Sequence, residues 1–130
     1  MENAKNDTPI FIIGNPRKEG IESVLADLET FVSDKCNLLG ATLGADAKAA
    51  VDAGAERLIV LGGDGTLIGI SRSLGVSQIP LIGVNAGKLG FLAEFTIDEL
   101  KRNFSACLCD AGMIDRRMVL HVEIQDQDCL

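Results

Sequence analysis

Apolar positions along the chain fall into two kinds of pattern, short continuous runs and stripes at helical spacing. The apolar runs at residues 9–13, 57–61 and 78–84 are short, and each is followed by a glycine or an asparagine. Runs of this length that stop at turn residues are typical of buried strands. Between the first two runs, apolar residues recur every three or four positions, which predicts a helix with one buried face. This stripe consists of Ile21, Val24, Leu25, Leu28, Phe31 and Val32.

Weaker patterns extend the series of elements. We expect a short strand at residues 36–40 and an alanine-rich helix at residues 45–53. Another helix should follow the run at 57–61 and end near Leu74. A glycine comes directly after each of these two helices, as is common where a helix ends.

The last third of the chain carries one helix signal and one strand signal. Thr96 and Glu99 form the sequence Thr-x-x-Glu, a capping box that predicts the start of a helix. This helix should stop near Gly112. Apolar and polar residues then alternate within residues 118–124, which predicts a final strand.

Strand and helix patterns alternate along the chain, so we predict an α/β fold. The expected architecture is a Rossmann-like, mostly parallel sheet with helices on both faces. In such a sheet the turns that follow the strands gather at one edge. Open α/β sheets bind their ligands at this edge, so the turns are the places to look for chemistry.

The most informative turn follows the run at residues 57–61. It consists of Gly62, Gly63, Asp64, Gly65 and Thr66, and a helix pattern follows it directly. The free amides of a helix N-terminus attract phosphate, and glycines allow close approach and positive φ angles. Because a carboxylate repels phosphate, Asp64 fits better as a metal ligand or as the base for a hydroxyl that attacks phosphorus. The alternative is that Asp64 only caps the following helix.

A second glycine-rich turn follows the run at residues 78–84. It contains Asn85, Gly87, Lys88 and Phe91. If the two preceding strands are neighbours, the two turns lie side by side and form a pocket for a chain of phosphates. Lys88 then reaches a phosphate or is an ordinary exposed lysine, and Asn85 fixes a ligand or stabilises its own turn. The turn at residues 14–15 is a further candidate for a phosphate-facing loop, with an ordinary strand ending as the alternative.

The composition narrows the class of ligand. The 130 residues carry a formal net charge of −7 without a cluster of lysines and arginines, which argues against a nucleic-acid surface. No apolar run reaches the roughly 20 residues of a membrane span. The four cysteines match no zinc-binding spacing, and we expect no protein-held metal site but free thiols in the cytoplasm. Small-molecule nucleotides are therefore the expected partners, and the single histidine, His121, is not expected to be catalytic.

The two turns together resemble a pair of family motifs. Leu-Gly-Gly-Asp-Gly-Thr-Leu-Ile from residue 61, followed by Gly-Val-Asn-Ala-Gly-Lys-Leu-Gly-Phe-Leu from residue 83, is similar to the NAD kinases. The first motif is shared with lipid kinases and loosely with phosphofructokinases, whereas the second is more specific to NAD kinases. Residues 117–124 also resemble the segment that opens the second domain of that family.

The resemblance implies phosphoryl transfer from ATP, or from inorganic polyphosphate, to the adenosine-ribose 2′-hydroxyl of NAD. The product is NADP, and a divalent cation, usually magnesium, accompanies the ATP. Asp64 matches the family's catalytic aspartate, which accepts the proton from that hydroxyl. The residues that match the phosphate and NAD contacts are Gly62, Gly63, Gly65, Thr66, Asn85 and Gly87. Phe91 matches an aromatic residue near the adenine, although it also fits as a core residue.

The resemblance further implies a division of the chain. Residues 1–113 would form the α/β nucleotide-binding domain, with a phosphofructokinase-like sheet, and residues 114–130 would begin a β-rich second domain that is otherwise missing. We therefore expect little or no turnover by this piece alone, and a homo-oligomer in the full-length form. Many family members carry a basic residue five positions after the aspartate, where this chain has Gly69. The alternatives are a kinase for lipids or other small molecules that shares only the first motif, and a non-catalytic nucleotide-binding module.

Overall fold

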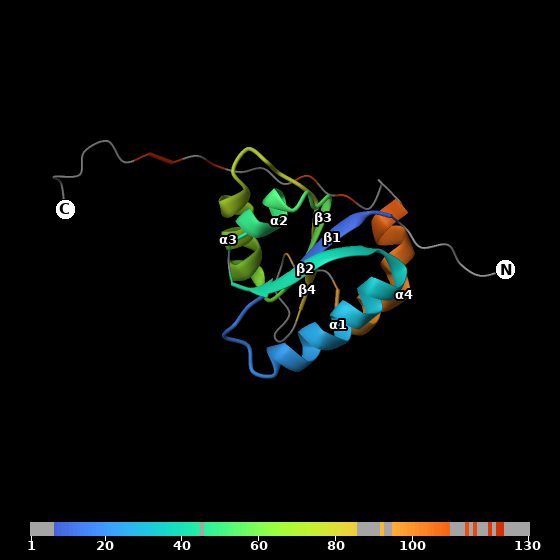
Figure 1. Ribbon diagram of the computed structural model, residues 1–130. Helices are drawn as coiled ribbons and strands as arrows, with labels where there is room; N and C mark the ends of the chain where they lie inside the picture. The colour runs from blue at the N-terminus through green and yellow to red at the C-terminus, as the bar shows by residue number, and fades with distance from the viewer. Residues whose placement is uncertain are drawn as a thin grey trace.

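A sheet of four parallel strands lies at the centre of the computed structural model (Figure 1). The structure describes residues 7–44, 46–85, 92, 95–109, 114, 116, 120, 122 and 123. The strands are β1 (Pro9–Gly14), β2 (Asn37–Leu43), β3 (Arg57–Leu61) and β4 (Leu81–Val84). They lie in the order β2-β1-β3-β4, and the pairings between them are parallel, which confirms the predicted α/β fold.

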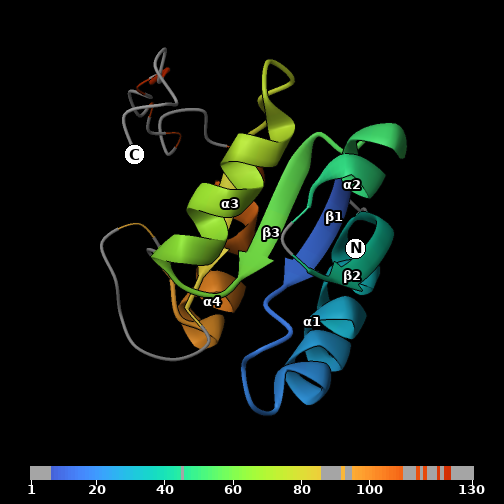
Figure 2. The same cartoon turned by 90° about the vertical axis from the view of Figure 1, so that its left-hand side faces the viewer.

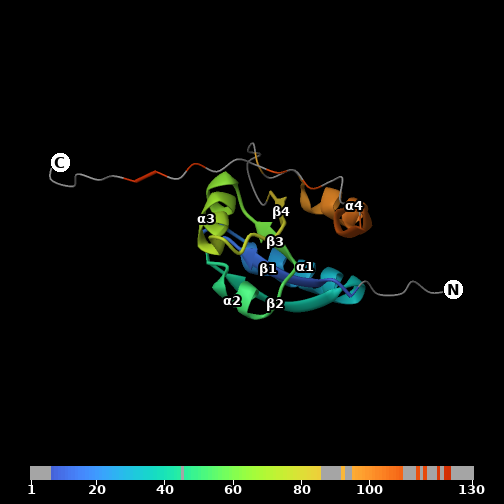
Figure 3. The same ribbon diagram turned by 90° about the horizontal axis from the view of Figure 1, so that it is seen from above.

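Helices cover both faces of the sheet (Figure 3). α1 (Ile21–Lys35) and α4 (Ile97–Cys109) lie on one face, and α2 (Lys48–Asp52) and α3 (Asp64–Leu74) lie on the other. Successive strand residues point to opposite faces. In β1, Ile12 packs with α1 and α4, whereas Ile13 packs with α2 and α3. Because both faces are buried, the central strands are continuous apolar runs rather than alternating ones.

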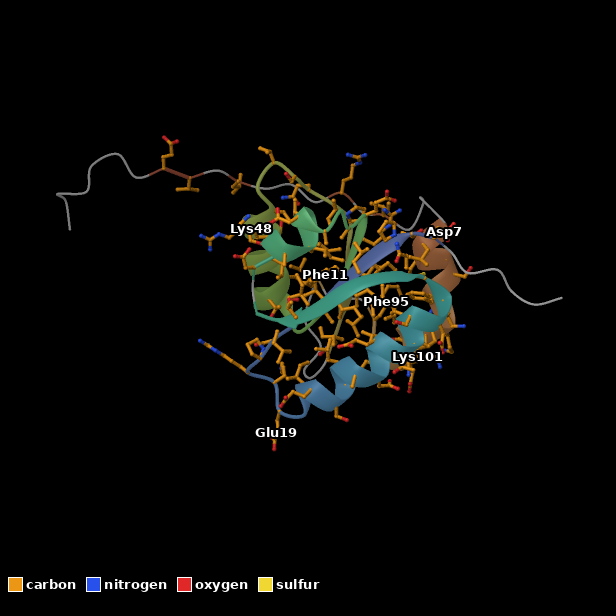
Figure 4. The ribbon with its side chains drawn as sticks, viewed as in Figure 1. Asp7, Phe11, Glu19, Lys48, Phe95 and Lys101 are labelled. Atoms are coloured by element: carbon orange, nitrogen blue, oxygen red, sulfur yellow. The ribbon has the colours of Figure 1, made fainter. Side chains whose placement is uncertain are left out.

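An aromatic contact and an ion pair join α1 to α4. The rings of Phe31 and Phe104 meet edge to face with their centroids 5.2 Å apart. Lys101, labelled in Figure 4, places its Nζ atom 2.7 Å from the carboxylate of Asp27. The earlier residue of α1 thus meets the earlier residue of α4, so the two helices run in the same direction. This is the arrangement expected for helices that each follow a strand of a parallel sheet.

Two strands differ in length from the sequence-based expectation. β2 extends to Leu43, beyond the predicted residues 36–40, because its later residues pair with the second half of β1. β4 begins at Leu81 rather than at residue 78. The reason is that Gln78, which follows α3, bonds back to that helix: its side-chain Nε2 donates to the carbonyls of Ser71 and Gly75 at 3.0 and 2.7 Å.

The alanine-rich helix is shorter than predicted. α2 comprises five residues, whereas the pattern indicated a helix over residues 45–53. The amide of Ala47 donates to the Ser73 hydroxyl of α3 at 2.9 Å, and the Asp46 carboxylate accepts from the amide of Lys48 at 2.9 Å. These side-chain contacts satisfy the amides at the start of α2, so the helix begins at Lys48.

The two signals of the last third of the chain have different outcomes. The capping box of α4 is confirmed, since the Thr96 amide donates to Glu99 Oε1 at 2.9 Å and the Glu99 amide donates to Thr96 Oγ1 at 3.2 Å. The predicted final strand at residues 118–124 is wrong for the residues that the structure describes. Leu120 and Val122 are exposed and, like Glu123, belong to no strand. A strand needs a neighbour for its backbone hydrogen bonds, and the four-stranded sheet does not pair with these residues. His121 and Gly112 lie outside the described residues.

Candidate functional site

The strands β1, β3 and β4 end at one edge of the sheet, and the arrowheads of β1 and β3 mark this edge in Figure 2. The amide of Asn15, directly after β1, donates to the carbonyl of Leu61 at 2.9 Å. The amide of Gly62, directly after β3, donates to the carbonyl of Val84 at 3.0 Å. The chain leaves β1 toward β2 on one side and leaves β3 toward β4 on the other. Open parallel sheets bind ligands at such a reversal point, so this edge is the candidate site.

The first glycine-rich turn is shaped by a close approach rather than by unusual backbone angles. A Cβ atom on Gly62 would lie 2.7 Å from Thr66 Oγ1 and 2.8 Å from Thr66 Cβ, so the site requires glycine there. At Gly63 and Gly65 a Cβ atom would meet nothing within 4 Å. The space beside these two residues is therefore open.

The expectation of positive φ angles in this turn is wrong. Among the described glycines, positive φ angles occur at Gly20, Gly44, Gly54 and Gly75, and not at Gly62, Gly63 or Gly65. Gly63 has an extended conformation with φ −110° and ψ −164°, which residues other than glycine also adopt. The glycines of this turn thus provide room for a ligand and for Thr66, which is their contribution to the site.

Asp64 connects the first turn to the second. It is the first residue of α3, with Gly63 in the N-cap position, so Asp64 is not the capping residue. Its Oδ1 atom accepts a hydrogen bond of 2.9 Å from the amide of Leu92, 28 residues further along the chain. This bond fixes the half-buried carboxylate between the two turns.

The ends of the second turn are fixed from both faces of the sheet. The Asn85 amide donates to the Phe95 carbonyl at 2.7 Å, and the Phe95 amide donates back to the carbonyl of Gly83 at 3.3 Å. Leu92 packs on the core beneath α2 and α3, whereas Phe95 packs on the core beneath α1 and α4. These apolar residues therefore anchor the turn rather than line it.

Of the residues predicted for the site, the structure brings together those of the first turn and Asn85. The predicted residues Gly87, Lys88 and Phe91 lie outside the described residues. The two turns do follow neighbouring strands, since β3 and β4 are paired, as the side-by-side arrangement required. The Leu92 amide was missed, because a backbone donor leaves no signature in the sequence.

Asn15 organises the third loop. Its side-chain Oδ1 accepts from the amide of Arg17 at 3.0 Å, and its carbonyl accepts from the amide of Lys18 at 3.2 Å. Asn15 thus stabilises its own turn, and the bond from its amide to Leu61 attaches that turn to β3. Arg17 and Lys18 follow Asn15 in this loop, at the same edge of the sheet as the first glycine-rich turn.

Among the described residues, no group of three histidine, cysteine, aspartate or glutamate side chains is arranged to hold a metal ion. Nor is any helix in the described part of the chain both long and apolar enough to cross a membrane. The described groups at this edge include backbone amides, the Asp64 carboxylate, the Thr66 hydroxyl and the loop that carries Arg17 and Lys18.

Comparison with known proteins identifies the family of these loops. Residues 42–111, more than half of the chain, match the family model described as the ATP-NAD kinase N-terminal domain. The chain belongs to the NAD kinase family. Both glycine-rich turns lie within the matched region, whereas the loop of Asn15 precedes it.

Individual NAD kinases show the same similarity. The NAD kinase of Geobacter sulfurreducens is 48% identical over 71 residues, which cover 55% of this chain and 25% of that protein. The NAD kinase of Acidithiobacillus ferrooxidans is 39% identical over 101 residues, 75% of this chain and 34% of that protein. The NAD kinase of Nitrosospira multiformis is 32% identical over 126 residues, which cover 88% of this chain and 43% of that protein. The chain thus spans less than half the length of these NAD kinases.

Proposed function

We propose that the complete protein is an NAD kinase that transfers a phosphoryl group from ATP to the adenosine-ribose 2′-hydroxyl of NAD. The observation that carries the proposal is the 2.9 Å hydrogen bond between Asp64 Oδ1 and the Leu92 amide. This bond holds an acid between the two glycine-rich turns whose sequences resemble those of NAD kinases. Membership of the family supports the same reaction.

Asp64 is proposed as the base of the reaction. A ribose hydroxyl is a weak nucleophile near neutral pH, and a positioned carboxylate that removes its proton increases its reactivity. The 2′-oxygen forms a bond to the γ-phosphorus while the bond from that phosphorus to the bridging oxygen of ADP breaks, and the proton passes to Asp64. The contact with Leu92 keeps the carboxylate in one orientation, which such a transfer requires.

The glycine-rich turns are proposed to position the substrates. The open space beside Gly63 and Gly65 lets a ligand come close to the backbone at the start of α3, where amides favour negative charge. Thr66 is held against Gly62 at the same turn. Asn85, Gly87, Lys88 and Phe91 are proposed to contribute from the second turn.

Magnesium is expected to enter with the ATP, or with polyphosphate if that is the donor. Since the described residues provide no group of three suitable side chains, the ion would take its ligands mainly from phosphate oxygens and water, with Asp64 the acid closest to the turns. When bound, it supplies charge neutralisation on the phosphates.

The proposal is tested by incubating the complete gene product with NAD and magnesium ATP and measuring NADP. We expect turnover in the ordinary range of about 1–1,000 per second. The 2′-deoxy analogue of NAD is the matched control, because it lacks the accepting hydroxyl and should give no product. Phosphorylation of a lipid such as diacylglycerol without any formation of NADP would contradict the proposal.

A further inference from the structure

The loop at the reversal point of the sheet carries two basic residues. Arg17 and Lys18 lie in the loop between β1 and α1, where Arg17 is exposed and Lys18 is half-buried. Neither side chain forms an ion pair or a hydrogen bond in the described part of the chain. Two other lysines of the described chain, Lys48 in α2 and Lys101 in α4, are instead paired with Asp52 and Asp27.

The loop that carries these cations is tied to the catalytic turn. The Asn15 amide donates to the carbonyl of Leu61, the residue before Gly62, at 2.9 Å. The same asparagine accepts from the amides of both Arg17 and Lys18, at 3.0 and 3.2 Å. The backbone of both cations is therefore fixed relative to the first glycine-rich turn by one residue.

A phosphoryl donor needs positive charge at this edge. The chain has a net charge of −7, and the carboxylate of Asp64 adds negative charge where a donor with several phosphates must approach. Guanidinium and ammonium groups bind phosphate oxygens through charge-assisted hydrogen bonds. Glu19, the acidic neighbour of the pair, extends away from the sheet (Figure 4).

We propose that Arg17 and Lys18 bind the non-transferred phosphates of the donor, a nucleoside triphosphate or a polyphosphate chain. The donor then lies on the β1 side of Asp64, and the acceptor lies toward the second glycine-rich turn beside β4. This inference rests on the proposed kinase function and assigns its donor side.

The test replaces both cations, Arg17→Gln with Lys18→Gln, in the complete gene product. Loss of two charge-assisted contacts should raise the KM for ATP about tenfold or more, while the KM for NAD stays within about twofold. Arg72→Gln is the matched control, because Arg72 is an exposed cation in the last turn of α3, away from this edge, and should leave both constants unchanged. An unchanged KM for ATP, or an equal rise in both constants, would overturn the assignment.

Binding of tripolyphosphate, measured by calorimetry without NAD, separates this assignment from the kinase reaction. If the wild-type protein binds tripolyphosphate at least tenfold more tightly than the double variant but makes no NADP, the loop assignment holds and the kinase proposal fails. If the two proteins bind it equally, or neither binds it, the loop assignment fails whatever the activity.

Discussion

At the scale of the residue, Gly62 and Gly63 have different reasons to be glycine although they are adjacent. Gly62 leaves the space that the side chain of Thr66 occupies, whereas Gly63 faces open space. The sequence indicated a phosphate-binding turn at both positions, but it attributed the glycines partly to positive φ angles. The difference between the two glycines follows from the short distance between a Cβ atom at residue 62 and the side chain of Thr66. That distance depends on how α3 packs against the end of β3.

This difference predicts unequal effects on stability. Gly62→Ala would place a Cβ atom 2.7 Å from Thr66 Oγ1 and should lower the free energy of unfolding by about 1–3 kcal/mol. Gly63→Ala meets nothing within 4 Å and should change it by less than about 0.5 kcal/mol. Urea denaturation of both variants measures the difference. Equal midpoints would show that the contact between residue 62 and Thr66 does not determine the cost of adding a Cβ atom.

At the scale of the element, the sequence predicts what an element determines by itself. α1 was predicted because its stripe of apolar residues identifies the buried face without any knowledge of the sheet. The length of β2 and the start of α2 were not predicted, because pairing with β1 and the hydroxyl of Ser73 determine them. The contact between Asp64 and Leu92 belongs to the same class, since its donor is a backbone amide 28 residues away.

The start of α4 gives a prediction that depends on pH. Hydrogen bonds from the Thr96 amide and the Thr96 hydroxyl stabilise the ionised Glu99 and lower its pKa below the ordinary value of 4.5. A lowered pKa contributes stability that is full above pH 4.5 and is lost as the pH falls through the folded-state pKa.

Carboxyl titration by NMR should therefore give a midpoint for Glu99 below 4.5, and Thr96→Ala should move that midpoint upward. Thr30→Ala, which removes an exposed threonine from α1, is the control and should leave it unchanged. A Glu99 midpoint that does not respond to Thr96→Ala would show that the capping box does not stabilise the charged carboxylate.

At the scale of the whole molecule, the order of the strands places the chemistry. The alternation of strand and helix patterns predicted a parallel sheet, and the pairing of β3 with β4 brought the two glycine-rich turns to one edge as expected. The position of β1 beside β3 was not predictable from the same patterns, and it is this pairing that attaches the loop of Asn15 to the end of β3. The division of the chain at residue 113 stays a prediction.

The central claim is that Asp64, held by Leu92 between two turns, accepts a proton during phosphoryl transfer. Its most direct test is the kcat of Asp64→Asn in the complete gene product at saturating NAD and ATP. We expect kcat to fall about 100- to 10,000-fold with KM values close to wild type, because an amide keeps the shape of the side chain but accepts no proton. Asp98→Asn, which removes an exposed acid from the first turn of α4, should leave kcat unchanged. A wild-type kcat for Asp64→Asn would contradict the account.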